Sequence, residues 1–211
     1  MSRDNILHRV RTALGRSAGQ AVADPPPVRI RIPEVDMEQR ISAMLASIEA
    51  LAGKTYRAAT PADAGAFVAA AIQGHSAVAS NAPFLAECGI SSLPGVRSGV
   101  TDREELRGLC AAADVGITSA DYALADTGSL VMIASPREAR LISLLPPAHI
   151  AVVPRGRILT GLDELFSVVP NPADVASSMV LITGPSRTAD IEQILVRGVH
   201  GPGQITVVVV G

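Results

Sequence analysis

Aromatic residues are nearly absent from this sequence: it has no Trp, and aromatics make up only 2% of its 211 residues. Because hydrophobic residues still account for 48%, the core has to be built from Ala, Val, Leu and Ile. Side chains of this size suit a parallel sheet covered by Ala-rich helices. The same scarcity removes the stacking surfaces with which proteins bind single-stranded nucleic acid.

A strong excess of charge is also lacking, since the formal net charge is only −2. A nucleic-acid-binding surface needs a basic excess, so we expect no nucleic-acid partner. No apolar run is long enough to span a bilayer, and residues 2–9 are too charged for a signal peptide. These features predict a cytoplasmic chain of one large domain, or of one domain with an appendage.

Cysteine is scarce as well: Cys88 and Cys110 stand alone, and no Cys-x-x-Cys pair occurs. A zinc site, an iron–sulfur cluster and a disulfide framework would all lack partners. The four histidines show no paired spacing either, so we expect this chain to hold no metal and no cofactor. The two cysteines are expected to be small buried residues in a reducing compartment.

The first part of the chain has its own pattern. Residues 2–14 place Ile6, Val10 and Leu14 on one face of a helix. Prolines then make residues 21–35 a stiff extended segment. We therefore predict an N-terminal helical arm at residues 1–20, a Pro-rich linker at residues 21–35 and an α/β domain at residues 36–211.

From residue 36 onward the pattern alternates between strand and helix. The expected helices cover residues 36–52, 61–73, 102–110, 137–144, 172–178 and 189–196. The expected strands cover residues 54–58, 76–80, 114–118, 130–133, 149–154, 179–183 and 204–210. Alternation of this kind, with continuously apolar strands, predicts an α/β fold whose open, mostly parallel sheet is flanked by helices.

The segment ADYALADTGSLVMIAS, residues 120–135, is the first candidate site. Asp126, Thr127, Gly128 and Ser129 form a polar turn that leads directly into an apolar strand, where α/β proteins tend to place binding groups. The alternative is that these side chains only satisfy the backbone of the turn. Asp121 is expected to have a structural role in the first turn of a short helix.

An Asp-Thr-Gly tripeptide also occurs in aspartic proteases, but those enzymes need two such loops. This chain has one, in an alternating α/β pattern, so the protease interpretation is rejected. A paired-carboxylate mechanism is not supported either. Asp121 and Asp126 diverge by about 140° on a helix and face opposite sides on a strand.

A second candidate site follows the strand at residues 179–183. Ser186 and Arg187 precede the expected helix at residues 189–196, and backbone N–H groups at such a helix start bind phosphate or carboxylate groups. The alternative is an ordinary capped helix. His200, among three glycines, is expected on an exposed loop that could contribute to the site. His149 begins an apolar strand and is expected to be a hydrogen-bonded structural residue.

Three segments carry a resemblance to a known family: ADYALADTGSLVMIAS, RLISLLPPAHIAVVP and ITGPSRTADIEQILVRGVHGPGQITVVVV. Together they resemble the LUD-domain family, specifically its lactate-utilization protein C group. The resemblance implies a fold similar to the superfamily of ribose-5-phosphate isomerase, glucosamine-6-phosphate deaminase and coenzyme A transferases. The family usually has Glu where this chain has Asp126, which shortens the carboxylate by one methylene.

The resemblance also implies a function. It points to the cluster-free subunit of a three-protein system that oxidises L-lactate to pyruvate, with iron–sulfur clusters on cysteine-rich partner proteins. The expected ligand is a small carboxylate or phosphate, bound by Asp126, Thr127, Gly128, Ser129, Ser186, Arg187 and His200. One alternative is a self-sufficient acyl-transfer or sugar-phosphate-processing enzyme, for which Asp126 is the best catalytic candidate. Another is a purely structural interaction module that uses the N-terminal arm.

Overall fold

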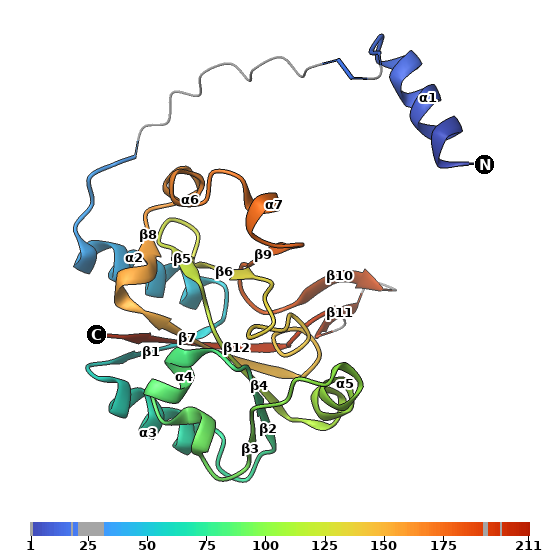
Figure 1. Ribbon diagram of the computed structural model, residues 1–211. Helices are drawn as coiled ribbons and strands as arrows, with labels where there is room; N and C mark the ends of the chain where they lie inside the picture. The colour runs from blue at the N-terminus through green and yellow to red at the C-terminus, as the bar shows by residue number, and fades with distance from the viewer. Residues whose placement is uncertain (1, 18, 21–31, 192–193, 199) are drawn as a thin grey trace. The chain divides into compact units, whose positions relative to one another are not determined.

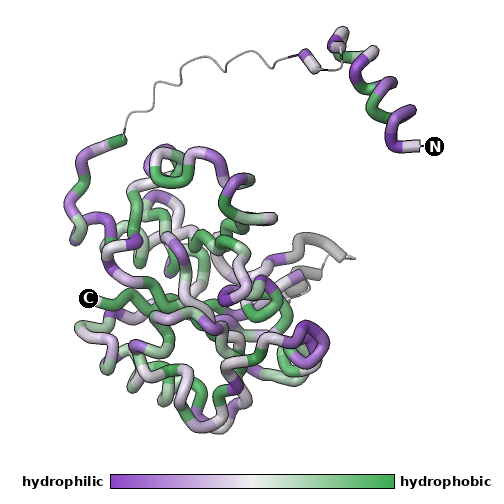
Figure 2. The backbone as a smooth tube through the Cα atoms, viewed as in Figure 1, coloured by the Kyte–Doolittle hydropathy of each residue, from purple (hydrophilic) through white to green (hydrophobic). Residues whose placement is uncertain are grey.

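The computed structural model describes residues 2–17, 19–20, 32–191, 194–198 and 200–211. Contacts divide the chain into two units, residues 1–31 and residues 32–211, which are described separately. In the first unit, helix α1 (Arg3–Ala13) begins after Ser2, whose hydroxyl accepts a hydrogen bond from the Asn5 backbone. No residue of α1 is buried, although Figure 2 shows hydrophobic residues along this helix. Residues 21–31 of the predicted linker lie outside the described residues.

The second unit is built on a six-stranded sheet. Its strands lie in the order β1-β12-β7-β4-β2-β3, and every neighbouring pair is parallel, which confirms the predicted α/β fold (Figure 1). The strands are β1 (Lys54–Ala58), β2 (Ala77–Ala79), β3 (Val96–Arg97), β4 (Val115–Ser119), β7 (Ala148–Pro154) and β12 (Gln204–Val210).

Both faces of this sheet are covered. Helices α3 (Pro61–Ala71) and α4 (Pro83–Glu87) pack on one face, and α2 (Met37–Ala50) lies on the other (Figure 1). Alternate residues of β12 therefore enter different cores: Val208 joins the first, and Val207 the second. Figure 2 shows hydrophobic residues concentrated along these central strands. The cores are mostly aliphatic, as the shortage of aromatic residues predicts.

The sequence predicts a single sheet, and this is wrong, because the second unit contains a second sheet. It has four strands in the order β8-β5-β6-β9, and β6 is antiparallel to both neighbours. The strands are β5 (Tyr122–Leu124), β6 (Ser129–Ile133), β8 (Ile158–Leu159) and β9 (Met179–Ile182). The turn at residues 125–128 is too short for a parallel crossover, so β6 has to run back along β5. Strand β9, expected to be buried, is partly exposed.

Capping residues explain where three helices begin. The carboxylates of Asp36 and Asp102 and the hydroxyl of Thr60 each accept a hydrogen bond from a backbone N–H three residues later. They start α2, α5 (Arg103–Ala112) and α3, close to the predicted boundaries. The remaining short helices are η1 (Ile90–Ser92), η2 (Arg155–Arg157), α6 (Leu162–Val168) and α7 (Pro172–Val175).

Two predicted helices are wrong, and a third is shorter than predicted. Residues 137–144 form turns, because the Ser135 hydroxyl accepts from the backbone N–H groups of Arg137 and Glu138 and holds the chain in a tight bend. In the helix expected at 189–196, residues 189–191 and 194–196 belong to antiparallel strands β10 (Arg187–Ile191) and β11 (Ile194–Arg197), and their β-branched residues favour strands. The helix expected at 172–178 ends at residue 175.

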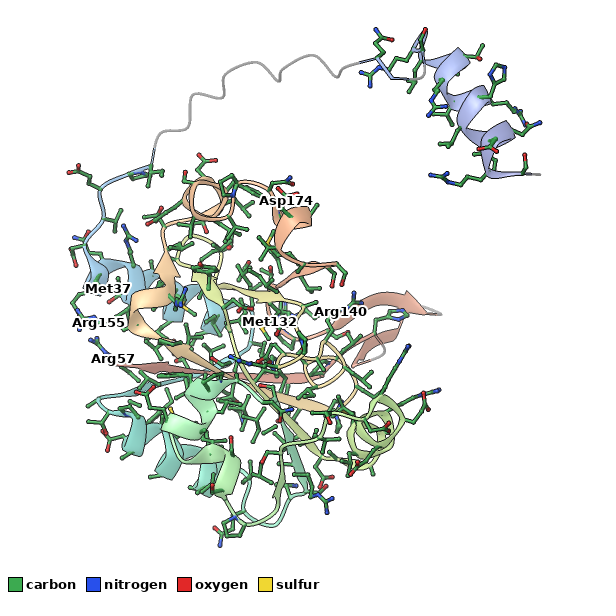
Figure 3. All side chains as sticks on the ribbon, viewed as in Figure 1. Met37, Arg57, Met132, Arg140, Arg155 and Asp174 are labelled. Atoms are coloured by element: carbon green, nitrogen blue, oxygen red, sulfur yellow. The ribbon has the colours of Figure 1, made fainter. Side chains whose placement is uncertain are left out.

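Ion pairs hold helix α2 against the rest of the second unit. Glu38 contacts Arg57 at 2.7 Å and Arg155 at 3.2 Å, and Figure 3 shows both arginines beside the start of α2. These groups are exposed, so they contribute little to stability. The pair of Arg40 and Glu164, at 3.0 Å, is better shielded from solvent and connects α2 to α6.

Among the described residues, no helix is long and apolar enough to cross a membrane.

Candidate binding site at the carboxyl edge of the sheet

The predicted Asp-Thr-Gly site lies in the turn between β5 and β6. Asp126 is exposed, and its carboxylate packs over Gly161, where a Cβ atom would lie 2.5 Å from Oδ2. Gly128 has φ +67°, and a Cβ there would lie 2.9 Å from the backbone nitrogen of Ile48 on α2. Glycine is therefore required for both the left-handed backbone and the close approach to α2.

The hydroxyl groups of this turn bind one another. Ser129 Oγ lies 2.8 Å from Thr127 Oγ1 and 2.6 Å from Thr183 Oγ1, just after β9. Thr127 also donates a hydrogen bond to Asp126 Oδ1 at 3.2 Å. This chain of hydrogen bonds ties the turn to β9 and favours the structural interpretation of the motif. A ligand-binding or catalytic role of Asp126 stays a prediction.

The second group of predicted residues comes together elsewhere. Ser186, Arg187 and His200 line a hollow of about 350 Å³ with Arg140, which is labelled in Figure 3. Asp126 is not among the lining residues. Arg187 donates a hydrogen bond of 2.5 Å to the carbonyl of Leu51 at the end of α2. A strand begins at Arg187, so the expected helix start is wrong, and anion binding here stays a prediction.

A larger cavity, of about 870 Å³, lies at the carboxyl ends of β2, β4 and β7. Ser119 and Pro154 end two of these strands, and the start of α4 and residues 133–138 complete the wall. Parallel strands end at one edge of a sheet, and α/β proteins commonly bind ligands at that edge. This cavity was not predicted from the sequence.

Asp121 is the first acidic group of this cavity, and its position corrects the prediction of a helical first turn. It directly precedes β5, and its Oδ2 accepts a hydrogen bond from the Ile133 backbone at 2.7 Å. Burial raises the pKa of Asp121, while the Ile133 N–H group and the charge of Arg157 act in the opposite direction. Asp121 thus ties β5 to β6 and faces the cavity as a half-buried carboxyl group.

Glu138 is the more deeply buried acid, with a side chain only 6% exposed. Its Oε2 accepts a hydrogen bond from the Ser80 hydroxyl at 2.7 Å, whereas its buried Oε1 has no partner. Burial raises the pKa of Glu138 to about 8, and the charge of Asp121 adds to this effect. Ser80 and the Ser119 backbone favour the ionised form less strongly. At neutral pH the carboxyl group of Glu138 is therefore mostly protonated.

Two arginines supply positive charge to the same cavity. Arg157 lies over the ring of Tyr122, with 5.3 Å between its guanidinium carbon and the ring centre. Arg137 is exposed, and its backbone carbonyl accepts a hydrogen bond from Asn81 at 2.8 Å. Guanidinium groups bind carboxylates well, and a protonated acid can donate a further hydrogen bond. The cavity thus has the groups needed to bind a small carboxylate.

Two other predictions concern buried residues. His149 is buried, and its Nε2 lies 2.8 Å from Thr118 Oγ1, which confirms a hydrogen-bonded histidine. Its Nδ1 has no partner, and burial lowers its pKa to about 4. Cys88 and Cys110 are buried as predicted, and burial raises the pKa of each to about 11. Both cysteines therefore remain thiols at neutral pH.

Comparison with known proteins places this fold in a family, because the LUD domain family model matches residues 41–210. The chain belongs to the LUD domain family. This confirms the family suggested by the three sequence segments. The matched LUD domain lies within the second unit and contains the carboxyl-edge cavity.

Several curated relatives of this LUD domain are named Lactate utilization protein C. One, from Bacillus mycoides (strain KBAB4), is 36% identical over 116 residues, or 53% of this chain and 50% of the relative. Another, from Bacillus subtilis (strain 168), is 42% identical over 94 residues, or 43% of this chain and 39% of the relative. The chain thus spans about half the length, or less, of the curated relatives it matches.

A solved structure supports the LUD-domain fold. The crystal structure of a DUF162 family protein from Deinococcus radiodurans has a TM-score of 0.65 and 19% sequence identity, and the match covers 84% of this chain and 100% of that one. At this identity the likeness shows the fold alone. Membership of the wider isomerase, deaminase and transferase superfamily stays a prediction.

Proposed function

We propose that this LUD-domain protein acts in the utilization of lactate and binds a small 2-hydroxy or 2-oxo carboxylate in the carboxyl-edge cavity. The names of its curated relatives support the role in lactate utilization. The observation that supports the ligand class is the presence of Arg137 and Arg157 in one cavity with the buried acid Glu138, whose pKa is raised by burial. A carboxylate matches the arginines, and a neutral acid suits an oxygen acceptor.

Within lactate utilization, we assign this chain the role of a cluster-free subunit that works with iron–sulfur partner proteins. Its two cysteines are buried thiols, which offer no thiolate to a cluster. The cavity is also larger than a three-carbon acid would fill. The remaining space suits a segment of a partner protein that approaches the bound carboxylate.

Calorimetry with L-lactate and pyruvate tests the ligand assignment. We expect Arg157→Gln to weaken binding by about tenfold or more, because a charge-assisted hydrogen bond contributes about 1.5–3 kcal/mol. Arg107→Gln is the matched control, since Arg107 lies on exposed α5 and does not line the cavity. Equal affinities for the two variants would contradict the assignment.

A further inference from the structure

The carboxyl group of Glu138, which lines the cavity, has one buried oxygen without a hydrogen-bond partner. Glu138 Oε2 accepts a hydrogen bond from Ser80, but Oε1 is buried without any hydrogen bond. An ionised carboxylate in this position would leave charge on an unpaired buried oxygen, which is costly. A proton on Oε1 removes the charge and makes that oxygen a donor, while Oε2 keeps its bond to Ser80.

The other charged and titratable groups of the cavity come from several elements. Asp121 precedes β5, Tyr122 lies on β5, Glu87 ends α4, Arg137 adjoins Glu138, and Arg157 ends η2. With every carboxyl group ionised, three negative charges would face two positive ones. Protonation of Glu138 leaves two negative and two positive charges. An anionic ligand then meets no excess of negative charge.

We propose that Glu138 is a ligand-binding residue that acts as a neutral acid. Its side chain lines the cavity, and on binding it turns so that the protonated Oε1, buried in the ligand-free structure, donates a hydrogen bond to an oxygen of a small carboxylate and holds the ligand and one proton together. The proton comes from solvent, and no covalent bond of the ligand changes. This inference rests on the proposed function and adds the protonation state of its binding site.

The proposal has a definite pH dependence. In the free protein the pKa of Glu138 is raised to about 8, so below that pH the proton is already present and affinity does not change with pH. A bound anion raises the pKa of Glu138 further, because a second negative charge beside it is disfavoured. Above about pH 8, binding has to take up a proton, and affinity falls by about tenfold per pH unit.

Isothermal titration of pyruvate tests this proposal from pH 6.5 to 9.5. At each pH, two buffers with different ionisation enthalpies report the number of protons taken up. We expect almost no uptake at pH 6.5 and close to one proton at pH 9.5. Glu138→Gln has a neutral amide donor of the same shape, so it should bind pyruvate without proton uptake and with an affinity independent of pH.

Two further variants separate this role from a general structural one. Asp121→Asn removes the charge that helps to raise the pKa of Glu138, so the fall in affinity should begin at a lower pH. Glu104→Gln removes an exposed carboxyl group on α5 that does not line the cavity, and it should leave the pH profile unchanged.

Different results would contradict different claims. If pyruvate binds the wild type without proton uptake at pH 9.5, with the pH profile of Glu138→Gln, the proton inference is wrong and the proposed function stands. If pyruvate and L-lactate do not bind, but acetate binds with uptake that Glu138→Gln abolishes, the proposed function is wrong and the inference stands. If none of the three binds at any pH, both claims are wrong.

Discussion

At the scale of single residues, this protein buries two titratable groups with opposite consequences. Glu138 has its pKa raised to about 8, and His149 has its pKa lowered to about 4. Both are neutral near neutral pH, and each has one buried polar atom without a partner. The histidine is accounted for by its bond to Thr118 inside the core. Each residue lines a cavity, and the cavity of Glu138 also contains Arg137 and Arg157, which points to a role in binding an anion.

The raised pKa of Glu138 predicts how the stability of the ligand-free protein depends on pH. Between the ordinary carboxyl pKa and about 8, the folded state holds a proton that the unfolded state has released. Rising pH therefore favours unfolding, by up to about 1.4 kcal/mol per pH unit in this window. Below about pH 6.5 the lowered pKa of His149 acts in the opposite direction, so urea unfolding between pH 6.5 and 8 should show this decline in the wild type and a smaller one in Glu138→Gln. Equal slopes in the two proteins would contradict the protonated state.

At the scale of secondary-structure elements, the Asp-Thr-Gly turn contacts α2 and the segments that follow β8 and β9. Its glycine contacts α2, its hydroxyl groups reach Thr183 beyond β9, and its backbone pairs with Thr160 beyond β8. Each residue of the motif therefore makes contacts that stabilise the fold, and none of these contacts needs a ligand.

Gly128→Ala tests this structural role. The substitution puts a Cβ atom on a residue with φ +67° and against the backbone of α2, so we expect a loss of about 1–3 kcal/mol in the free energy of unfolding. Gly156→Ala is the control, because nothing lies within 4 Å of the added atom. Urea unfolding of both variants measures the difference. A Gly128→Ala protein as stable as the control would show that the turn is not under this constraint.

Sequence patterns recovered the elements whose signals are local. The strands at residues 115–119 and 204–210 are short runs rich in β-branched residues, and α2 begins at a capping aspartate. Strand β5 was missed because it has only three residues and is defined by its partners β6 and β8. Hairpin β10–β11 was mistaken for a helix because its acidic and apolar residues also fit a capped helical pattern.

The carboxyl-edge cavity could not be predicted because its groups converge only in the folded chain. Ser80 follows β2, Asp121 precedes β5, and Glu138 lies in a loop that resembled a helix. The prolines at residues 136 and 146–147 gave no warning, because proline commonly stands just before and just after a helix. The unusual protonation of Glu138 depends on burial, which one sequence does not reveal.

At the scale of the whole molecule, the Asp-Thr-Gly turn and the cavity lie at opposite ends of β5 and β6. The turn joins these strands at one end, whereas Tyr122 and Ile133 at the other end line the cavity, where β4 and β7 also end. The proposed carboxylate site therefore lies at the edge where the parallel strands of the LUD domain end. Helix α1 precedes the matched LUD domain and belongs to the other unit.

The central claim is that pyruvate or lactate binds beside Arg157 and Glu138, and not at Asp126. Its most direct test is the pyruvate dissociation constant of Arg157→Gln and Asp126→Asn, measured by calorimetry at pH 7. We predict a loss of affinity of about tenfold or more for Arg157→Gln, and less than about twofold for Asp126→Asn. The reverse pattern, with binding lost in Asp126→Asn and kept in Arg157→Gln, would contradict the account.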